Sequence, residues 1–374
     1  MQGIGIIGCG NISSAYLRLA PLFKGLEVRA VADINADAAR ARASEFNVRA
    51  ETVEGLLRAA DIDIVVNLTI PDAHFTITRD ILRADKHAYC EKPIVLSLAE
   101  GEELRAIAAE KNLRIGSAPD TFLGAAHQAA RAAIDEGAIG NVISGTAHVM
   151  SHGLEHWHPN PDFFFLPGAG PMLDIGPYYV TNLIQLIGPV KKVAALTSTP
   201  HTTRTILSEP RRGEVIPVKT PTTIHALLEF HSGATITLST SWDVWAHRHG
   251  NMELYGTEAT MFLPDPNWFS GTLEVVGKDG QSYVLEPEGH PFGIPNQHDQ
   301  DEPKANYRTA GLADMAAALN EGRAHRCSLD LAIHAVDVMT SVLKSGETGE
   351  MVTLSTTCTR PDPLPAEAAR ALLK

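Results

Sequence analysis

The sequence has little of several features that would place a protein in a specialised class. Its four cysteines are spread over 374 residues without a CxxC pair, which argues against a zinc site or a disulfide framework and leaves them as small apolar fillers. With a net charge of −13 and no basic block, it lacks the attraction to phosphate on which nucleic-acid binding depends. No apolar run approaches the roughly 18 residues that a membrane span needs. We expect a soluble protein whose partner is a small molecule.

The start of the chain also lacks the marks of an export signal. The apolar stretch 3–9 follows Met1 directly, with no basic segment before it and no small-residue cleavage site after it. We therefore expect a cytoplasmic protein. A chain of 374 residues exceeds the size at which single cores stop growing, so two domains are expected.

The first part of the chain alternates short β-branched runs with amphipathic helical stretches. Such alternation predicts a parallel sheet with helical crossovers, and hence a doubly wound α/β domain over residues 1–121. The five runs are GIGIIG, LEVRAVAD, DIDIVVNLT, KHAYCEKP and LRIGSAPD.

The rest of the chain, residues 122–374, has a different sequence pattern. Apolar and Thr-rich runs recur with short turns between them, which predicts a mainly antiparallel sheet in an α+β domain that binds substrate. The pattern also predicts a strand at about 141–150 and helices at about 124–136, 171–187, 308–321 and 331–345.

A glycine-rich turn follows the first predicted strand. Gly8 permits a tight turn, and Gly10 permits close approach to a pyrophosphate held at the N-terminus of the next helix. Ser13 stands at the third glycine position of this fingerprint, where a small residue is needed. With Asn11 and Ile12, this turn predicts a dinucleotide site.

Asp33 ends the next strand, roughly 25 residues downstream, where dinucleotide-binding domains place an acidic residue. Its carboxylate can accept hydrogen bonds from the adenosine ribose and would repel a 2′-phosphate, so NAD is favoured over NADP, with Ile34 beside it at the cofactor. Alternatively, Asp33 only caps the following helix. Arg40 and Arg42 lie nearby and leave NADP binding open.

Glu91 and Lys92 follow a predicted parallel strand at its carboxyl end, where ligands of open α/β sheets bind. Pro93 restricts the backbone directly after them and aims the lysine. The alternative is an ion pair on the surface.

At this point the chain resembles the Gfo/Idh/MocA family, which includes glucose-fructose oxidoreductase and inositol dehydrogenase. The resemblance rests on Gly8-Cys9-Gly10-Asn11-Ile12, Thr69-Ile70-Pro71 with His74, Glu91-Lys92-Pro93 and Asp174-Ile175-Gly176-Pro177-Tyr178, in this order and spacing. It implies a Rossmann domain joined to a large antiparallel sheet, with NAD as cofactor and a sugar or polyol as substrate. It also implies a homodimer or homotetramer built through the outer face of that sheet.

The resemblance further implies residue roles. Lys92 matches the catalytic lysine of the family, and Thr69, Pro71, His74 and Glu91 match positions that line the cofactor.

Asp174 matches the aspartate of the D-x-G-x-H motif, but Tyr178 replaces its histidine, as in some relatives. We expect hydride to leave a carbinol carbon for the nicotinamide while the hydroxyl proton passes to Tyr178. Lys92 would stabilise the phenolate and the developing alkoxide. Asp174 would orient Lys92 or hold a second hydroxyl. Without the motif, Tyr178 would be read as an aromatic packed in its helix.

Several polar and aromatic residues precede this motif in the segment 152–162. Trp157 offers a flat face for a sugar ring, and His156 and His158 offer directional hydrogen bonds. A zinc site is the alternative, but the segment lacks a matching Cys or an HExxH-type helix, so no metal is expected. Asp120, after the last strand of the first domain, is predicted to point into the same cleft.

Two other functions stay open. An NAD-tethered hydrolase or lyase would oxidise a sugar carbon transiently to permit elimination, as some members of the family do. A non-catalytic NAD-binding sensor is the third hypothesis, which the presence of both Lys92 and Tyr178 disfavours.

Overall fold

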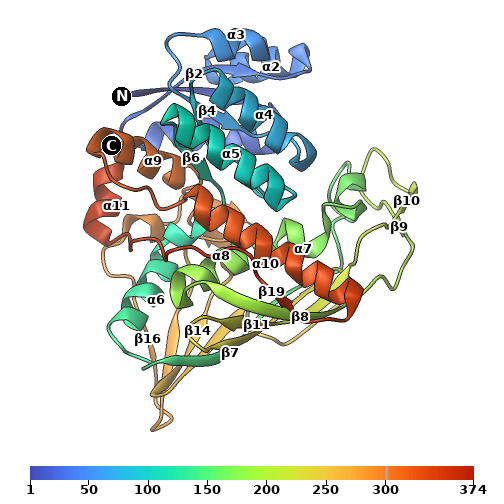
Figure 1. Cartoon of the computed structure of the whole chain (residues 1–374), viewed down its shortest axis with the longest axis vertical. Coiled ribbons are helices and arrows are strands. Elements are labelled where there is room, and N and C mark those ends of the chain that lie inside the picture. Colours follow the sequence, from blue (N-terminus) through green and yellow to red (C-terminus); the bar gives the residue numbers. More distant parts are fainter. Residues whose placement is uncertain (300–301) are drawn as a thin grey trace.

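The first of two large sheets is parallel and six-stranded, in the order β3-β2-β1-β4-β5-β6. The computed structural model describes residues 1–299 and 302–374 (Figure 1). The five apolar runs of the sequence form β1, β2, β4, β5 and β6. The strands are β1 (Gln2–Ile7), β2 (Leu26–Ala32), β3 (Arg49–Glu51), β4 (Ile64–Asn67), β5 (His87–Cys90) and β6 (Ile115–Ser117).

Helices connect these strands, and three of them begin at a residue whose side chain caps the helix. Asn35 caps α2 by accepting hydrogen bonds from the amides of Asp37 and Ala38, and Ser97 forms a capping box with Glu100 at the start of α5. The short α3 and strand β3 have no apolar periodicity and fall outside the predicted elements. The helices are α1 (Asn11–Leu19), α2 (Ala36–Phe46), α3 (Val53–Arg58), α4 (Pro71–Arg83) and α5 (Leu98–Lys111), with a short turn η1 (Ala20–Leu22).

The second sheet has nine strands in the order β16-β15-β14-β13-β7-β12-β11-β8-β19. Its pairs are antiparallel, as predicted, except that β12 runs parallel to β7. The exception arises because helices carry the chain across the sheet between β7 and β8. The strands are β7 (Val142–Met150), β8 (Val190–Ser198), β11 (Thr223–Phe230), β12 (Thr235–Ser241), β13 (Met252–Gly256), β14 (Ala259–Leu263), β15 (Glu274–Gly277), β16 (Ser282–Val284) and β19 (Val352–Thr353).

The helix expected over 171–187 is interrupted at Ile175. It forms α7 (Gly170–Asp174) and α8 (Gly176–Ile187). Pro177 has no N–H to continue the ladder of α7, but proline suits the first turn of a helix, so a new helix begins there. The prediction of one continuous helix was therefore wrong.

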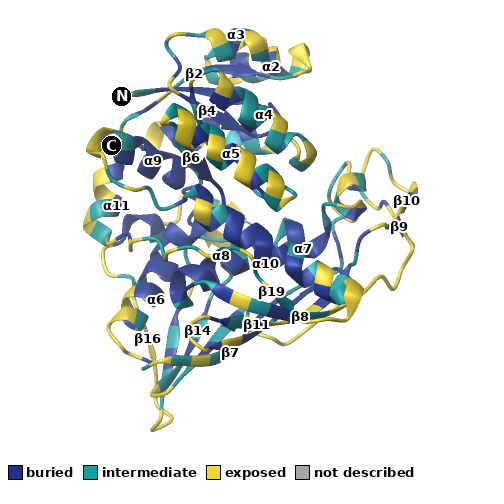
Figure 2. Cartoon of the chain, viewed as in Figure 1, coloured by how far each residue is buried: buried dark blue, intermediate teal, exposed yellow. Residues whose placement is uncertain are grey.

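The C-terminal part of the chain returns to the first sheet. Helices α6 (Ala125–Asp135), α8 and α10 (Leu329–Thr348) are largely buried against the nine-stranded sheet (Figure 2). Helix α9 (Ala310–Glu321) packs on β6, and α10 also contacts α5. Helix α11 (Ala366–Leu372), which was not predicted, ends beside the residues that follow η1, where the amide of Lys24 donates to the carbonyl of Leu372 at 2.8 Å. Both domains are thus fastened together by this segment.

A small ribbon, residues 199–220, projects from one end of the nine-stranded sheet (Figure 1). It contains β9 (Thr203–Thr205) and β10 (Val215–Pro217) and packs on the turn η3 (Asp162–Phe165). A hydrophobic cluster separate from the main core joins the ribbon to η3 and to the residue after β12, and it consists of Phe165, Ile206, Ile216, Val218 and Trp242.

The remaining short elements are η2 (Thr121–Leu123), η4 (Pro291–Gly293), β17 (Gln297–Asp299) and β18 (Glu302–Lys304). Cys9, Cys90 and Cys327 are buried free thiols and Cys358 is a half-buried one, which confirms their prediction as apolar fillers. Within the described residues, no helix combines the length and the apolar character needed to cross a membrane.

Candidate active site

The glycine turn after β1 has the shape of a dinucleotide cradle. Gly8 has a φ of +103°, and a Cβ atom there would lie 2.5 Å from the carbonyl oxygen of Leu68, so this position requires glycine. A Cβ on Gly10 would instead project into open space, with no atom within 4 Å. Since the turn opens α1, its backbone is accessible to a pyrophosphate at the helix N-terminus.

Asp33 fixes this turn and also remains partly exposed. Its carboxylate accepts hydrogen bonds from the amides of Cys9 at 2.7 Å and Asn35 at 2.8 Å. The cap of α2 is Asn35, so the alternative in which Asp33 caps that helix is wrong. Ile34 is fully exposed, and Arg42 donates to the carbonyl of Gly10 at 3.3 Å.

The motif after β4 combines two half-buried residues with a buried histidine. Thr69 and Pro71 are half-buried at the carboxyl edge of the sheet. His74 is buried behind them, with Nδ1 2.7 Å from the carbonyl oxygen of Pro93 and Nε2 3.0 Å from that of Thr69. Burial lowers the pKa of His74. With both ring nitrogens engaged, His74 supports this edge, which corrects its prediction as a residue that lines the cofactor.

Lys92 and Asp174 form an ion pair inside the protein. The Lys92 Nζ atom lies 2.8 Å from Asp174 Oδ1 and 2.7 Å from the Asp174 carbonyl oxygen, and the two side chains are only 16% and 15% exposed. The alternative of a surface ion pair is therefore wrong. Burial lowers the pKa of Lys92, but the charge of Asp174 and the phenol of Tyr178 raise it more, so Lys92 is a stable ammonium.

Tyr178 lies in the first turn of α8, and Lys92 Nζ is 5.3 Å from the centroid of its ring. Glu91 lies beside this pair, with one carboxylate oxygen accepting from the Tyr16 hydroxyl at 2.9 Å. The fold thus brings Lys92, Asp174 and Tyr178 together, although 82 residues separate the first two in sequence. Their catalytic roles stay a prediction.

The segment 152–162 reaches toward this cluster. His158 is half-buried, and the amide of Asn160 donates to its Nδ1 atom at 3.1 Å. Burial lowers the pKa of His158, while the hydrogen bond with Asn160 and the charge of Asp174 act in the opposite direction. Trp157 is 57% exposed, and His156 is exposed. Their contacts with substrate stay a prediction.

A buried charged triad anchors this segment to the ribbon. Arg204, on β9, lies 3.0 Å from the carboxylate of Glu155 and also pairs with Asp243 after β12. Ser208 of the ribbon donates to the carbonyl of His158 at 2.6 Å. Since all three triad side chains are buried, the segment that carries His158 is firmly held.

The chain was compared with known proteins. Residues 2–118 match the model of an oxidoreductase family with an NAD-binding Rossmann fold, and residues 127–262 match the C-terminal domain of the same GFO/IDH/MocA family. The chain belongs to the Gfo/Idh/MocA family. The predicted family, the two-domain fold and the NAD-binding Rossmann domain are thereby confirmed.

Curated relatives match over part of their length. The 1,5-anhydro-D-fructose reductase of Ensifer adhaerens is 31% identical over 182 residues, 47% of this chain and 53% of that protein. The inositol 2-dehydrogenase of Rhizobium meliloti is 30% identical over 138 residues, 37% and 42% of the two chains. The chain thus spans about half the length of these relatives. Levoglucosan dehydrogenase in complex with NADH and L-sorbose has the same fold, with a TM-score of 0.81 at 20% identity over 95% of this chain and 99% of that one.

In this member of the Gfo/Idh/MocA family, Asp120 is not placed as the sequence predicted for a residue that contacts substrate. It is 2% exposed, and its Oδ2 atom accepts hydrogen bonds from the amides of Thr309 at 2.9 Å and Gly311 at 3.0 Å. Burial raises its pKa to about 6 despite these bonds. The carboxylate therefore holds the start of α9, which corrects the expectation that it points freely into the cleft.

We expect Asp120→Asn to change how stability depends on pH. A carboxyl whose pKa rises from 3.8 to about 6 on folding stabilises the fold below pH 4 and loses that contribution as the pH rises through 6. Asparagine keeps an acceptor for Thr309 but cannot ionise. Urea unfolding of both proteins should show the variant gaining about 2 to 3 kcal/mol relative to wild type between pH 4 and 7. A difference that is constant with pH would contradict this assignment.

Arg308 is a residue of the site that the sequence analysis missed, since it appeared only as the start of a helix. Its guanidinium donates to the carbonyl and the side-chain oxygen of Asn267 at 2.9 and 2.8 Å, and Tyr178 and Asp120 are among the groups that influence its charge. Burial lowers the pKa of Arg308, but these two neighbours raise it above its ordinary value. No motif marks it, because its neighbours are remote in sequence.

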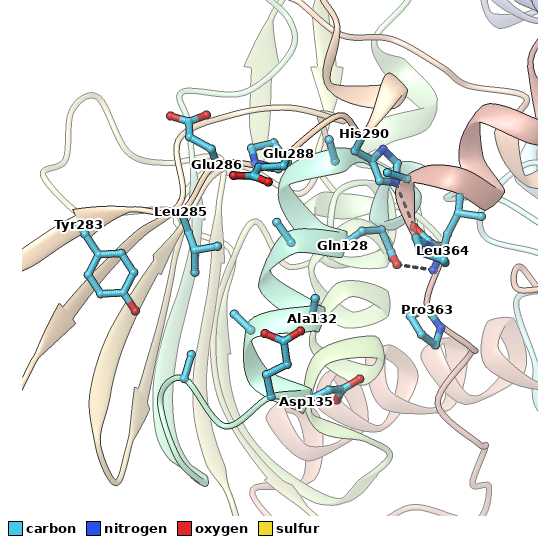
Figure 3. Close-up of a pocket in the computed structure, with 18 residues that line it drawn as sticks. Gln128, Ala132, Asp135, Tyr283, Leu285, Glu286, Glu288, His290, Pro363 and Leu364 are labelled. Carbon is cyan, nitrogen blue, oxygen red and sulfur yellow. Dashed lines mark hydrogen bonds between the residues drawn. The ribbon is translucent and has the colours of Figure 1, made fainter.

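A cavity of about 790 Å³ lies away from these residues, between α6, the end of β16 and the C-terminal tail (Figure 3). Alanines of α6 line much of it. Its buried polar groups bind the tail: Gln128 accepts from the amide of Leu364 at 2.6 Å, and His290 lies 3.0 Å from the Leu364 carbonyl. The candidate catalytic residues Lys92, Asp174 and Tyr178 do not line this cavity.

Proposed function

We propose that the chain is an NAD-dependent dehydrogenase that oxidises a secondary hydroxyl of a sugar, sugar derivative or polyol. The observation that carries this proposal is the Lys92 ammonium, held by Asp174 next to Tyr178. This cluster follows β5 in a sheet whose carboxyl edge also holds the glycine turn, so a bound dinucleotide would end near the cluster.

The residues at this edge fit NAD. The open backbone at Gly10 and the N-terminus of α1 suit the pyrophosphate, Asp33 suits the ribose hydroxyls, and the exposed Ile34 suits a face of the adenine. When bound, the nicotinamide supplies a hydride acceptor.

The chain's own groups would then handle the proton and the charge. Tyr178 accepts the hydroxyl proton of the substrate as the C–H bond breaks, which yields a ketone, NADH and a proton. Lys92 stabilises negative charge on the substrate oxygen. Asp174 keeps the ammonium in place through two contacts.

The substrate class is supported by the segment 152–162 and by the relatives. The exposed ring of Trp157 and the imidazoles of His156 and His158 suit a polyhydroxylated ring. Two relatives bear the names of a polyol dehydrogenase and a sugar reductase.

The test is a screen of sugars, sugar acids and inositols for NADH absorbance, with Tyr178→Phe as the control. Stoichiometric NADH from a free sugar would support the proposal. Product without net NADH would instead indicate an NAD-tethered hydrolase or lyase. NAD binding without turnover of any compound would leave the sensor hypothesis.

For cofactor choice, we expect Asp33→Ser to lower the ratio of kcat/KM with NAD to kcat/KM with NADP at least about tenfold, since it removes a charge that repels the 2′-phosphate. Asp37→Ser is the matched control, because Asp37 carries the same charge in α2 and pairs with Arg40. A wild-type preference for NADP would contradict the role of Asp33.

We also propose that the protein is a homodimer or homotetramer through the outer face of the nine-stranded sheet. Leu196 on β8 and Leu227 on β11 are 76% and 58% exposed, on neighbouring antiparallel strands near one edge of this sheet. Light scattering of wild type and Leu227→Asp would test this assembly.

A further inference from the structure

The cavity beside α6 has an apolar floor that is made by one face of this helix. The residues of α6 that line it recur every three or four positions, which places them on a single stripe. The alanines of this stripe are Ala125, Ala129, Ala132 and Ala133. Their small side chains leave the space above the helix open, and Leu285 and the tail segment 363–366 form the walls (Figure 3). The cavity is therefore an apolar groove of about 790 Å³, a volume typical of sites for small molecules.

The polar groups of this groove are of two kinds. The buried ones are already bonded within the protein, since Gln128 and His290 both contact the backbone of Leu364. The exposed ones are carboxylates, and the described residues that line the groove include no lysine or arginine. The groove thus combines an apolar floor with negative charge at its surface.

Most of this negative charge is not compensated by the protein. Among the four lining carboxylates, only Asp135 is paired, with Arg131 at 2.6 Å and Arg360 at 2.9 Å. The other three are exposed and form no ion pair with the described part of the chain. They are Glu136, Glu286 and Glu288.

Two of the unpaired carboxylates lie near the start of α6. Glu286 and Glu288 flank Pro287 in the sequence. Pro287 and Ala125, the first residue of α6, lie on either side of Gly293, where a Cβ atom would be 2.7 Å from Ala125 Cβ and 4.0 Å from Pro287 Cγ. Figure 3 shows both glutamates at this end of the groove.

The third unpaired carboxylate lies at the opposite end. Glu136 follows the last residue of α6, Asp135, which Figure 3 shows at the far end of the groove from Glu286 and Glu288. The C-terminus of a helix is the negative end of its dipole, so a cation is favoured there. The helix separates the two ends by about 16 Å, from the rise per residue.

We propose that this groove binds an aliphatic polyamine, a ligand distinct from the substrate of the active site. Its ammonium groups pair with the carboxylates at both ends, and its methylene chain covers the alanines between them. A ligand with one positive charge would leave one end unpaired, and an anion would be repelled. The net charge of −13 adds a general attraction for a polycation, so the test has to separate the groove from the overall charge.

The first measurement is isothermal titration calorimetry of the whole protein with spermine at low ionic strength, because salt weakens exposed ion pairs. We expect saturable binding of one spermine per chain. Ala132 is exposed within the groove, so Ala132→Phe fills the groove without a change in net charge. This variant should bind spermine at least about tenfold more weakly, which corresponds to the loss of one or two methylene contacts.

The second measurement removes the charges at one end. Glu286→Gln combined with Glu288→Gln should weaken spermine binding about fivefold, as expected for two exposed ion pairs. The matched control is Glu347→Gln combined with Glu350→Gln, which removes the same charge at the C-terminal end of α10, where both glutamates are exposed. It should leave the affinity unchanged.

Three results would overturn the proposal. The first is the absence of saturable spermine binding. The second is binding that folded Ala132→Phe retains, or that both glutamine pairs weaken equally, because either shows attraction to overall charge alone. The third is a lysine tripeptide that binds as tightly as spermine, which would assign the groove to a basic peptide. Thermal unfolding of each variant checks its fold.

Discussion

Lys92→Ala is expected to abolish turnover while NAD still binds. The ammonium acts on charge that develops in the transition state, whereas the adenosine half of the cofactor would be held by the glycine turn and Asp33. Isothermal titration calorimetry with NAD, together with kcat from a substrate identified in the screen, separates the two effects. Parallel loss of affinity and activity would mean that Lys92 is mainly a cofactor ligand.

The same variant leaves Asp174 without its partner in a mostly buried place, and such a charge destabilises a fold. The pair Lys92→Met with Asp174→Asn removes both charges and provides a folded reference that should also lack activity. Lys111→Ala is the surface control, because Lys111 pairs with Asp85 on the outside of the first domain.

Tyr178→Phe should lower kcat by a factor of about 10² to 10⁴, which is the usual contribution of a positioned general acid or base to the rate. Substrate binding should change less. The ring volume is kept, so the packing of α8 persists. The pH profile of the wild type should show an ionisation that the variant lacks.

Tyr179→Phe is the matched control in the same helix. The Tyr179 hydroxyl accepts from the side-chain amide of Asn251 at 3.0 Å and donates to the carboxylate of Asp265 at 3.2 Å. Its loss should affect stability and leave the pH profile intact. If Tyr178→Phe retains near-normal kcat, the proton leaves through another group, and the imidazole of His158 becomes the next candidate, because Lys92 is already an ammonium.

The sequence was sufficient for features that depend on local patterns. Buried β-branched runs predicted the strands of the first sheet, and glycines predicted the turn at Gly8. The position of Lys92 at the carboxyl end of a predicted parallel strand identified it as a candidate site residue. Features that depend on remote partners were missed or misassigned. Asp120 binds the amide of Thr309, 189 positions away, and Arg308 binds the side chain of Asn267, 41 positions away. The break at Ile175 was also missed, because the apolar spacing of 171–187 continues across it.

The separate hydrophobic cluster of the ribbon has a consequence for how this enzyme family could diversify. Phe165, Ile206, Ile216, Val218 and Trp242 pack on one another outside the main core, so changes there are absorbed locally and leave the Rossmann domain undisturbed. The ribbon nevertheless holds the segment of His158 by the Ser208 contact. Exchange of the ribbon between relatives is therefore expected to change how the segment of His158 is held, while Lys92, Asp174 and Tyr178 keep their contacts with one another.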